Sequence, residues 1–103
     1  MEVDKKRSGL GAVAVVFDDS DGYPPSAPPG QYQVLSDRVW LLSCPGCGHL
    51  SSMRCGTPKP SPGPSWEVSG TAEAPSLHPS INCTGCCGWH GYLKNGVFDA
   101  CKD

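Results

Sequence analysis

The sequence predicts a small, mainly β, zinc-ribbon-like domain built from short antiparallel strands with little helix. Three observations lead to this fold class. The 103 residues include 13 glycines and 11 prolines, which interrupt helices and favour turns. No window of the chain has the apolar periodicity of an amphipathic helix. Two C-x-x-C pairs, starting at Cys44 and Cys83, have the spacing with which a tight turn offers two thiolates to one metal ion.

The chain divides by composition into two parts. Residues 1–31 are expected to form a flexible N-terminal arm that ends in a proline-rich linker, because residues 18–31 have the sequence DDSDGYPPSAPPGQ and show no periodicity. Within this arm, residues 9–17 are apolar and β-branched, which predicts a strand or a buried edge segment. Residues 32–103 are expected to form the zinc-binding β domain.

The strands of residues 32–103 are predicted from apolar runs that lie between turn signals. The strongest signal is a hairpin around Asn95-Gly96, because a two-residue type I′ turn requires positive φ at both central positions and these residue types tolerate it. The other predicted strands cover residues 32–43, 49–55, 66–69 and 75–81.

Composition and charge exclude several classes of function. A net charge of −2 and a pI of about 5.8 argue against nucleic acid as the main partner, because binding to phosphates requires a positive field. No apolar run approaches the roughly 20 residues of a membrane span, and we find no secretory signal. We therefore expect a cytoplasmic protein. We also expect a protein as its partner. A reducing cytoplasm leaves paired cysteines available as metal ligands.

The seven cysteines supply the candidate ligands for Zn²⁺. Cys44 and Cys47 of the CPGC motif form the best pair, since the small residues between them allow a tight turn. His90 is an alternative ligand in the second half, and a second metal ion is left open. Cys55 stands apart and is expected to be a free buried cysteine. Disulfides, in an oxidising compartment or a virus particle, are the rival interpretation. The candidate thiol ligands are Cys44, Cys47, Cys83, Cys86, Cys87 and Cys101.

Short motifs follow one another along residues 38–101: CPGC at 44–47, Trp66 with Gly70, PSLHPSI at 75–81, Cys87 with His90, and YLKNG at 92–96. Their order resembles a family of small proteins that are common in bacteriophage genomes and are often mislabelled as ammonia monooxygenase. The resemblance implies a compact, β-rich zinc domain that is phage-encoded and acts in the host cytoplasm. Relatives in bacterial ubiquitin-like conjugation operons are regarded as peptidases that process the ubiquitin-like protein or release it from its targets.

The peptidase interpretation assigns roles to particular residues. A serine peptidase needs a nucleophile, a base and hydrogen-bond donors for the oxyanion. Ser80, in the stretch most similar to the family, would be the nucleophile and His90 the base, while amides of the glycine-rich loop 85–91 could form the oxyanion hole. No acid stands at a recognisable spacing from His90, so Asp99 or Glu67 could orient the histidine only if the fold brings one of them close to it. The plainer alternatives are a turn serine and a zinc-ligating histidine; a zinc hydrolase is a third option, but several nearby thiols favour a closed, structural site.

The first interpretation of the sequence is a zinc-stabilised binding or accessory protein, phage-encoded, that mediates protein interaction. The alternatives are a peptidase that processes a ubiquitin-like or other protein C-terminus with Ser80 and His90, and a structural component of the virion. A Ser80 hydroxyl within about 3.5 Å of an unligated nitrogen of His90, in an open groove, would favour the peptidase. A His90 bound to zinc, or a buried Ser80, would favour the accessory role.

Overall fold

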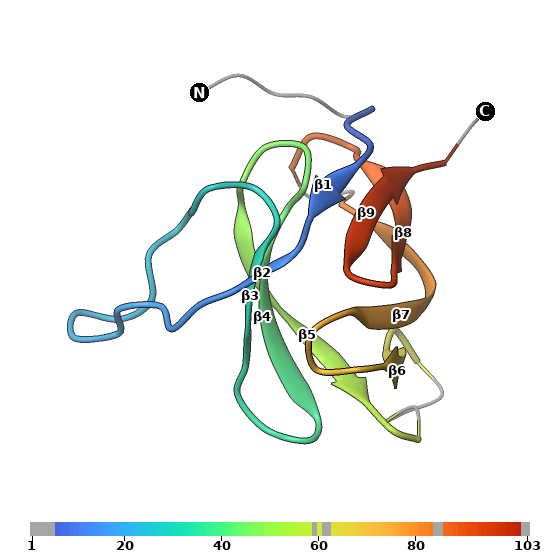
Figure 1. Ribbon diagram of the computed structural model, residues 1–103. Helices are drawn as coiled ribbons and strands as arrows, with labels where there is room; N and C mark the ends of the chain where they lie inside the picture. The colour runs from blue at the N-terminus through green and yellow to red at the C-terminus, as the bar shows by residue number, and fades with distance from the viewer. Residues whose placement is uncertain (1–5, 59, 61–62, 84–85, 102–103) are drawn as a thin grey trace.

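The computed structural model describes residues 6–58, 60, 63–83 and 86–101, and in this part of the chain every regular element is a β-strand (Figure 1). No helix that could cross a membrane occurs among these residues. The expectation of a small, mainly β protein is therefore confirmed, whereas the zinc-ribbon architecture stays a prediction. The strands are β1 (Leu10–Gly11), β2 (Val13–Ala14), β3 (Gln31–Val34), β4 (Val39–Ser43), β5 (Leu50–Gly56), β6 (Trp66–Gly70), β7 (Pro75–Asn82), β8 (His90–Lys94) and β9 (Val97–Ala100).

The nine strands form one nearly closed, barrel-like sheet in the order β1-β9-β8-β7-β6-β5-β4-β3-β2. The strands at its two ends, β1 and β2, are separated in the chain by Ala12 alone. The Ala12 N–H donates to the Gly96 carbonyl at 2.8 Å, and the Val13 N–H donates to the Gly30 carbonyl at 3.0 Å. One short segment thus joins both ends of the sheet, so that few strand edges remain open.

The first third of the chain contributes to this sheet. β1 pairs with β9, β2 pairs in parallel with β3, and Phe17 is buried. The proline-rich segment reaches the CPGC turn, where the Ala27 N–H donates to the Gly48 carbonyl at 2.9 Å. The division into an arm (1–31) and a domain (32–103) stays a prediction, and residues 1–5 of that arm lie outside the described residues.

The single strand expected over residues 32–43 is wrong, because the chain turns back within this segment. β3 ends at Val34 and β4 begins at Val39, and the two pair antiparallel. The Leu35 N–H donates to the Val39 carbonyl at 3.0 Å, and the Arg38 N–H donates to the Ser36 hydroxyl at 3.1 Å. The polar residues 36–38 therefore form a turn, in which the Ser36 side chain, and not a neighbouring strand, accepts the hydrogen bond of the Arg38 N–H.

The hairpin predicted around Asn95-Gly96 is confirmed. β8 and β9 pair antiparallel up to Lys94 and Val97, which leaves two residues for the turn. Asn95 has φ of 50° and Gly96 has φ of 78°, as a type I′ turn requires.

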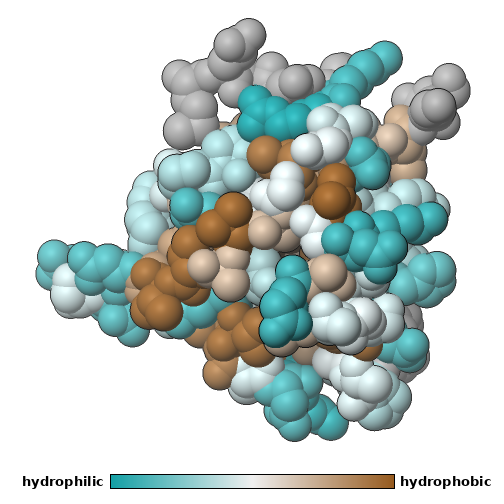
Figure 2. Space-filling view, in the orientation of Figure 1, coloured by the Kyte–Doolittle hydropathy of each residue, from teal (hydrophilic) through white to brown (hydrophobic). Residues whose placement is uncertain are grey.

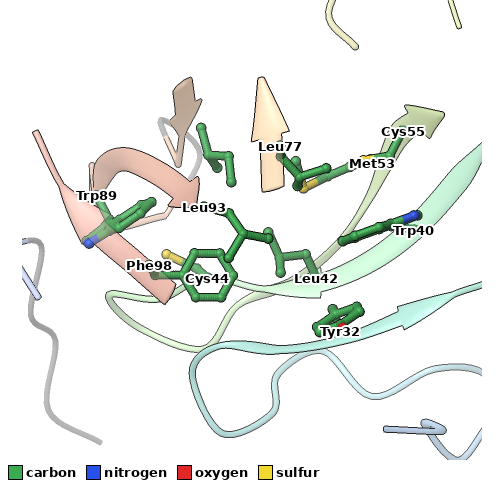
Figure 3. Packing of buried hydrophobic residues seen from close by; sticks show 11 residues of the cluster. Tyr32, Trp40, Leu42, Cys44, Met53, Cys55, Leu77, Trp89, Leu93 and Phe98 are labelled. Carbon is green, nitrogen blue, oxygen red and sulfur yellow. The ribbon is translucent and has the colours of Figure 1, made fainter. Parts of the chain in front are cut away.

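The core lies on the inner face of the curled sheet and is rich in aromatic side chains (Figure 3). Tyr32 and Trp40 stack with ring centroids 5.0 Å apart. Trp89 and Phe98 meet edge to face at 6.1 Å. Two tryptophans thus fill much of a small core, as expected, while Trp66 at the start of β6 is half-buried. Some apolar side chains stay outside: brown patches are visible on the face in Figure 2, and Val13, Val16 and Val34 are among the exposed apolar residues.

Gly91, next to His90 in β8, has no room for a side chain. A Cβ there would press on the Asp99 carbonyl and lie 2.7 Å from Cη2 of Trp89. We predict that Gly91→Ala lowers the free energy of unfolding by about 1–3 kcal/mol, because a close-packed interior must shift to admit the methyl group. Urea-induced unfolding measures the change. Gly11→Ala is the matched control, since a Cβ at Gly11 meets no atom within 4 Å; equal losses in the two variants would contradict the prediction.

Candidate functional site

Four cysteines from two distant turns meet at one point of the fold. Their Sγ atoms, from Cys44, Cys47, Cys86 and Cys87, all lie within 4.8 Å of one another. The Sγ atoms of Cys44 and Cys87 are 3.6 Å apart. Cys44 and Cys47 follow β4, whereas Cys86 and Cys87 lie between β7 and β8. The cluster therefore links the turn after β4 to the turn before β8. We call these four residues the cysteine cluster.

Tight turns present these sulfurs to one another. In the CPGC turn, the Gly48 N–H donates to the Cys44 carbonyl at 2.8 Å, and the Gly46 N–H points at the Cys44 sulfur at 3.4 Å. Gly48 has φ of 84°, a conformation that glycine adopts without steric cost. In the second turn, the N–H groups of Cys86 and Gly88 donate to the carbonyl of Cys83 at 3.2 and 3.0 Å. Amides aimed at sulfur stabilise the thiolate form that binds a metal.

The electrostatics of the cluster favour a cation at its centre. The interaction with the Cys83 side chain, together with burial, raises the pKa of the Cys44 thiol far above its usual value. Burial, with the neighbouring Cys47 and Cys44 thiols, raises the pKa of Cys86 to about 12. Several thiolates this close together repel one another unless a positive ion neutralises them. Four thiolates in a tight group are the ligand set that tetrahedral Zn²⁺ prefers, so the cluster could hold such an ion.

The other predicted thiol ligands lie nearby but outside this group. Cys83 interacts with the Cys44 side chain, and its N–H donates to the Trp89 carbonyl at 2.8 Å. The Cys101 N–H donates to the His90 carbonyl at 2.8 Å, which places Cys101 beside β8. The choice of ligands among the six candidates stays a prediction, and the geometry favours the four members of the cysteine cluster.

Cys55 lies in β5, is fully buried in the core, and is separate from the cysteine cluster. Burial raises the pKa of its thiol to about 12. An unfolded cysteine loses its proton above about pH 8.5, so raising the pH between these two values favours unfolding.

We predict that iodoacetamide at pH 8 leaves Cys55 unmodified in the native protein and alkylates it after unfolding, as peptide mass mapping would report. Half-buried Cys101 is the internal comparison. Equal alkylation of Cys55 and Cys101 in the native protein would refute this assignment.

Ser80 and His90 form a hydrogen-bonded pair on neighbouring strands. The Nε2 atom of His90 lies 2.9 Å from the Oγ atom of Ser80, and both side chains are half-buried. The pairing of β7 with β8 shifts between Leu77 and Ile81, where β7 has two more residues than β8. Asn82 opposes His90, so the alternation of side chains along β7 places Ser80, two residues before Asn82, on the same face of the sheet as the histidine. The distance is within the range of a nucleophile and its general base.

A further contact holds Ser80, and neither Asp99 nor Glu67 is bonded to His90. The Trp66 indole Nε1 donates to the Ser80 carbonyl at 3.1 Å. Asp99 accepts a hydrogen bond from the Gly9 N–H at 2.8 Å, while Glu67 is exposed and opposes His78 across β6 and β7. Within the described residues, no carboxylate hydrogen-bonds to His90, so the arrangement is a pair and not a triad. Loop 85–91 as an oxyanion hole stays a prediction: the N–H groups of Cys86 and Gly88 are bonded to the Cys83 carbonyl, and residue 85 lies outside the described residues.

One comparison with known proteins finds a match. A family model described as bacterial ubiquitination-like system serine protease (BubE) matches residues 20–101. No curated protein and no solved structure gives a match. The matched region contains the cysteine cluster, Ser80 and His90, and it extends the resemblance seen in the motifs toward the N-terminus.

Proposed function

The chain belongs to the family of bacterial ubiquitination-like system serine proteases, and from this premise we propose that it is a peptidase with Ser80 as nucleophile and His90 as general base. The observation that carries the proposal is the 2.9 Å contact between Ser80 Oγ and His90 Nε2. This contact supports the peptidase over the accessory role, because this nitrogen of His90 faces the serine.

The proposed reaction is acyl transfer in two steps. His90 takes the hydroxyl proton of Ser80 as the oxygen attacks the substrate carbonyl, and it then gives that proton to the departing amine. Water next attacks the resulting ester; His90 takes a proton from the water and returns it to Ser80. Among the described residues no carboxylate bonds to His90, and the contact that the structure gives its imidazole is the one with Ser80.

The cysteine cluster has a structural role in this proposal. Its four sulfurs would hold a zinc ion, which would supply charge neutralisation and a rigid link between the two turns. Four thiolate ligands leave no open coordination position for a substrate or an activated water. Cys87 of the cluster lies three residues before His90, so a bound ion would fix the start of β8 and with it the position of the base.

The substrate class follows from the family description. The description names a serine protease of a ubiquitination-like system, which suggests a ubiquitin-like protein as the substrate. Cleavage would occur either at the C-terminus of that protein or at the bond to its target. A phage origin, a location in the host cytoplasm, and a role as a virion component or as a protein-binding accessory protein stay predictions from the sequence.

A fluorophosphonate probe tests the function without knowledge of the substrate. This reagent phosphonylates serines activated by a neighbouring base, and we expect one adduct per chain, on the peptide that contains Ser80. His90→Gln is expected to slow labelling by about 100-fold or more, because the base is lost. Ser69→Ala, which removes an exposed serine in β6, is the matched control and should label normally. Labelling that does not depend on His90 would refute the peptidase proposal and favour the accessory role.

A further inference from the structure

Trp66 connects the proposed nucleophile to a neighbouring strand. Its indole Nε1–H donates to the Ser80 carbonyl at 3.1 Å. The strands β6 and β8 are the two neighbours of β7 in the sheet, and the Ser80 hydroxyl lies 2.9 Å from Nε2 of His90 on β8. Ser80 is therefore held at two points. Its main chain is held by the first residue of β6, and its side chain contacts the first residue of β8.

The indole extends the connection between β6 and β7 beyond their regular pairing. That pairing runs from Gly70 with Pro75 to Glu67 with His78. Trp66 precedes Glu67, and Ser80 lies two residues after His78. At this end of the pairing a side-chain N–H reaches a main-chain carbonyl, so the side chain does the work that a strand N–H does elsewhere in the sheet.

The donor belongs to a residue that is itself fixed. The main chain of Trp66 pairs with Cys55 of β5, which is fully buried. The half-buried Trp66 ring packs against the hydrophobic core. A ring packed in this way has few rotamers open to it, so its N–H stays directed at the Ser80 carbonyl.

The acceptor controls the direction of the nucleophile. The Ser80 carbonyl belongs to the peptide group that joins Ser80 to Ile81, and the Ile81 side chain is buried in the core. Because a peptide group is planar, holding its oxygen restricts ψ of Ser80 and the direction in which the Ser80 side chain leaves the strand. A misplacement of about 1 Å in a reacting group can cost about 100-fold in rate. One hydrogen bond to the main chain can therefore affect the reactivity of the hydroxyl.

We propose that Trp66 is a positioning residue, whose indole N–H holds the Ser80 carbonyl so that the hydroxyl stays within reach of His90. The inference rests on the proposed peptidase function and deepens it. Trp66 takes no part in the bond-forming steps. A purely structural tryptophan would differ in its effect, because its alteration would change stability and leave the geometry of the Ser80–His90 pair as it is.

The test removes the indole N–H and keeps the shape of the ring. Site-specific replacement of Trp66 by 3-benzothienylalanine puts sulfur in place of the N–H group. The fold should survive, because one hydrogen bond is lost while the volume of the side chain is kept, and thermal unfolding checks this. The same replacement at Trp40 is the matched control, because that ring stacks on Tyr32 and its indole makes no hydrogen bond within the described residues.

Two measurements report on the Ser80–His90 pair. The fluorophosphonate probe gives the maximal rate of phosphonylation and the apparent affinity separately, and the Trp66 analogue should lower this rate about tenfold or more with unchanged affinity. The ¹⁵N resonance of His90 Nε2 responds to the hydrogen bond with Ser80. In the Trp66 analogue it should move toward its position in Ser80→Ala. The Trp40 analogue should match the wild type in both measurements.

The His90 resonance requires no catalysis, so it separates this inference from the proposed function. A folded Trp66 analogue with the wild-type resonance, or with the wild-type rate of phosphonylation, would overturn the positioning role even if the protein is an active peptidase. A wild type that the probe does not label would refute the peptidase function alone, since the resonance still tests the positioning.

A measurement on the wild type decides the matter if the Trp66 analogue does not fold. Phosphonylation of Ser80 changes the group that the Trp66 indole is proposed to hold. The Trp66 indole ¹⁵N–H resonance should therefore move more than those of Trp40 and Trp89. A Trp66 resonance that stays in place while Ser80 is modified would overturn the proposal.

Discussion

Replacing Ser80 with alanine is expected to lower kcat/KM for peptide-bond or ester hydrolysis by about 10⁴-fold or more, because the attacking oxygen is gone. The fold should survive, since Ser80 is half-buried and the bond of its hydroxyl within the described part of the chain is to His90. The loss of that bond costs only about 1 kcal/mol. Steady-state kinetics with p-nitrophenyl acetate, together with thermal unfolding of the same samples, separate loss of chemistry from loss of structure.

Ser76→Ala is the matched control for this result. Ser76 lies in the same strand and is also half-buried, but its hydroxyl accepts a hydrogen bond from the Asn95 N–H and contacts no histidine. We expect it to retain activity. The double variant Ser80→Ala, His90→Ala should be no slower than Ser80→Ala alone, because two residues that act as one unit are not additive. Retained activity in Ser80→Ala, or a further large loss in the double variant, would contradict the assignment.

Removal of the metal is expected to unfold the protein. A chain of this size with a small core has little stability to spare, and structural zinc in small domains supplies about 10–16 kcal/mol of apparent binding free energy at neutral pH. The cysteine cluster joins the turn after β4 to the turn before β8, so its loss separates the two halves of the sheet. Circular dichroism during titration with a zinc chelator, under reducing conditions, should show loss of the cooperative transition.

Two cysteine variants sharpen this experiment. Cys87→Ser removes one member of the cysteine cluster and should abolish tight binding of about one ion per chain, with the same loss of folding. Cys101→Ser, also half-buried but outside the cluster, should bind metal and melt normally. A chelated, reduced sample whose melting temperature does not change would refute the structural role of the metal. So would equal behaviour of the two variants.

Local patterns in the sequence determined the small all-β character and the hairpin. Glycine and proline frequency, the absence of helical periodicity, and Asn95-Gly96 act through the backbone conformation of neighbouring residues, which needs no distant partner. The CPGC turn is equally local. The sequence also named Ser80 and His90, but it did so through a resemblance between motifs and not through any spacing that brings them together.

Tertiary structure alone decided which residues meet. Cys86 and Cys87, rather than Cys83 or Cys101, join the CPGC turn, because the end of β7 and the start of β8 set where that loop lies. Ser80 and His90 share a face because Asn82 opposes His90, and a shift of one residue in this register would move every side chain of β7 to the other face. Register and strand order are set by packing across the whole sheet, which no short segment of sequence contains.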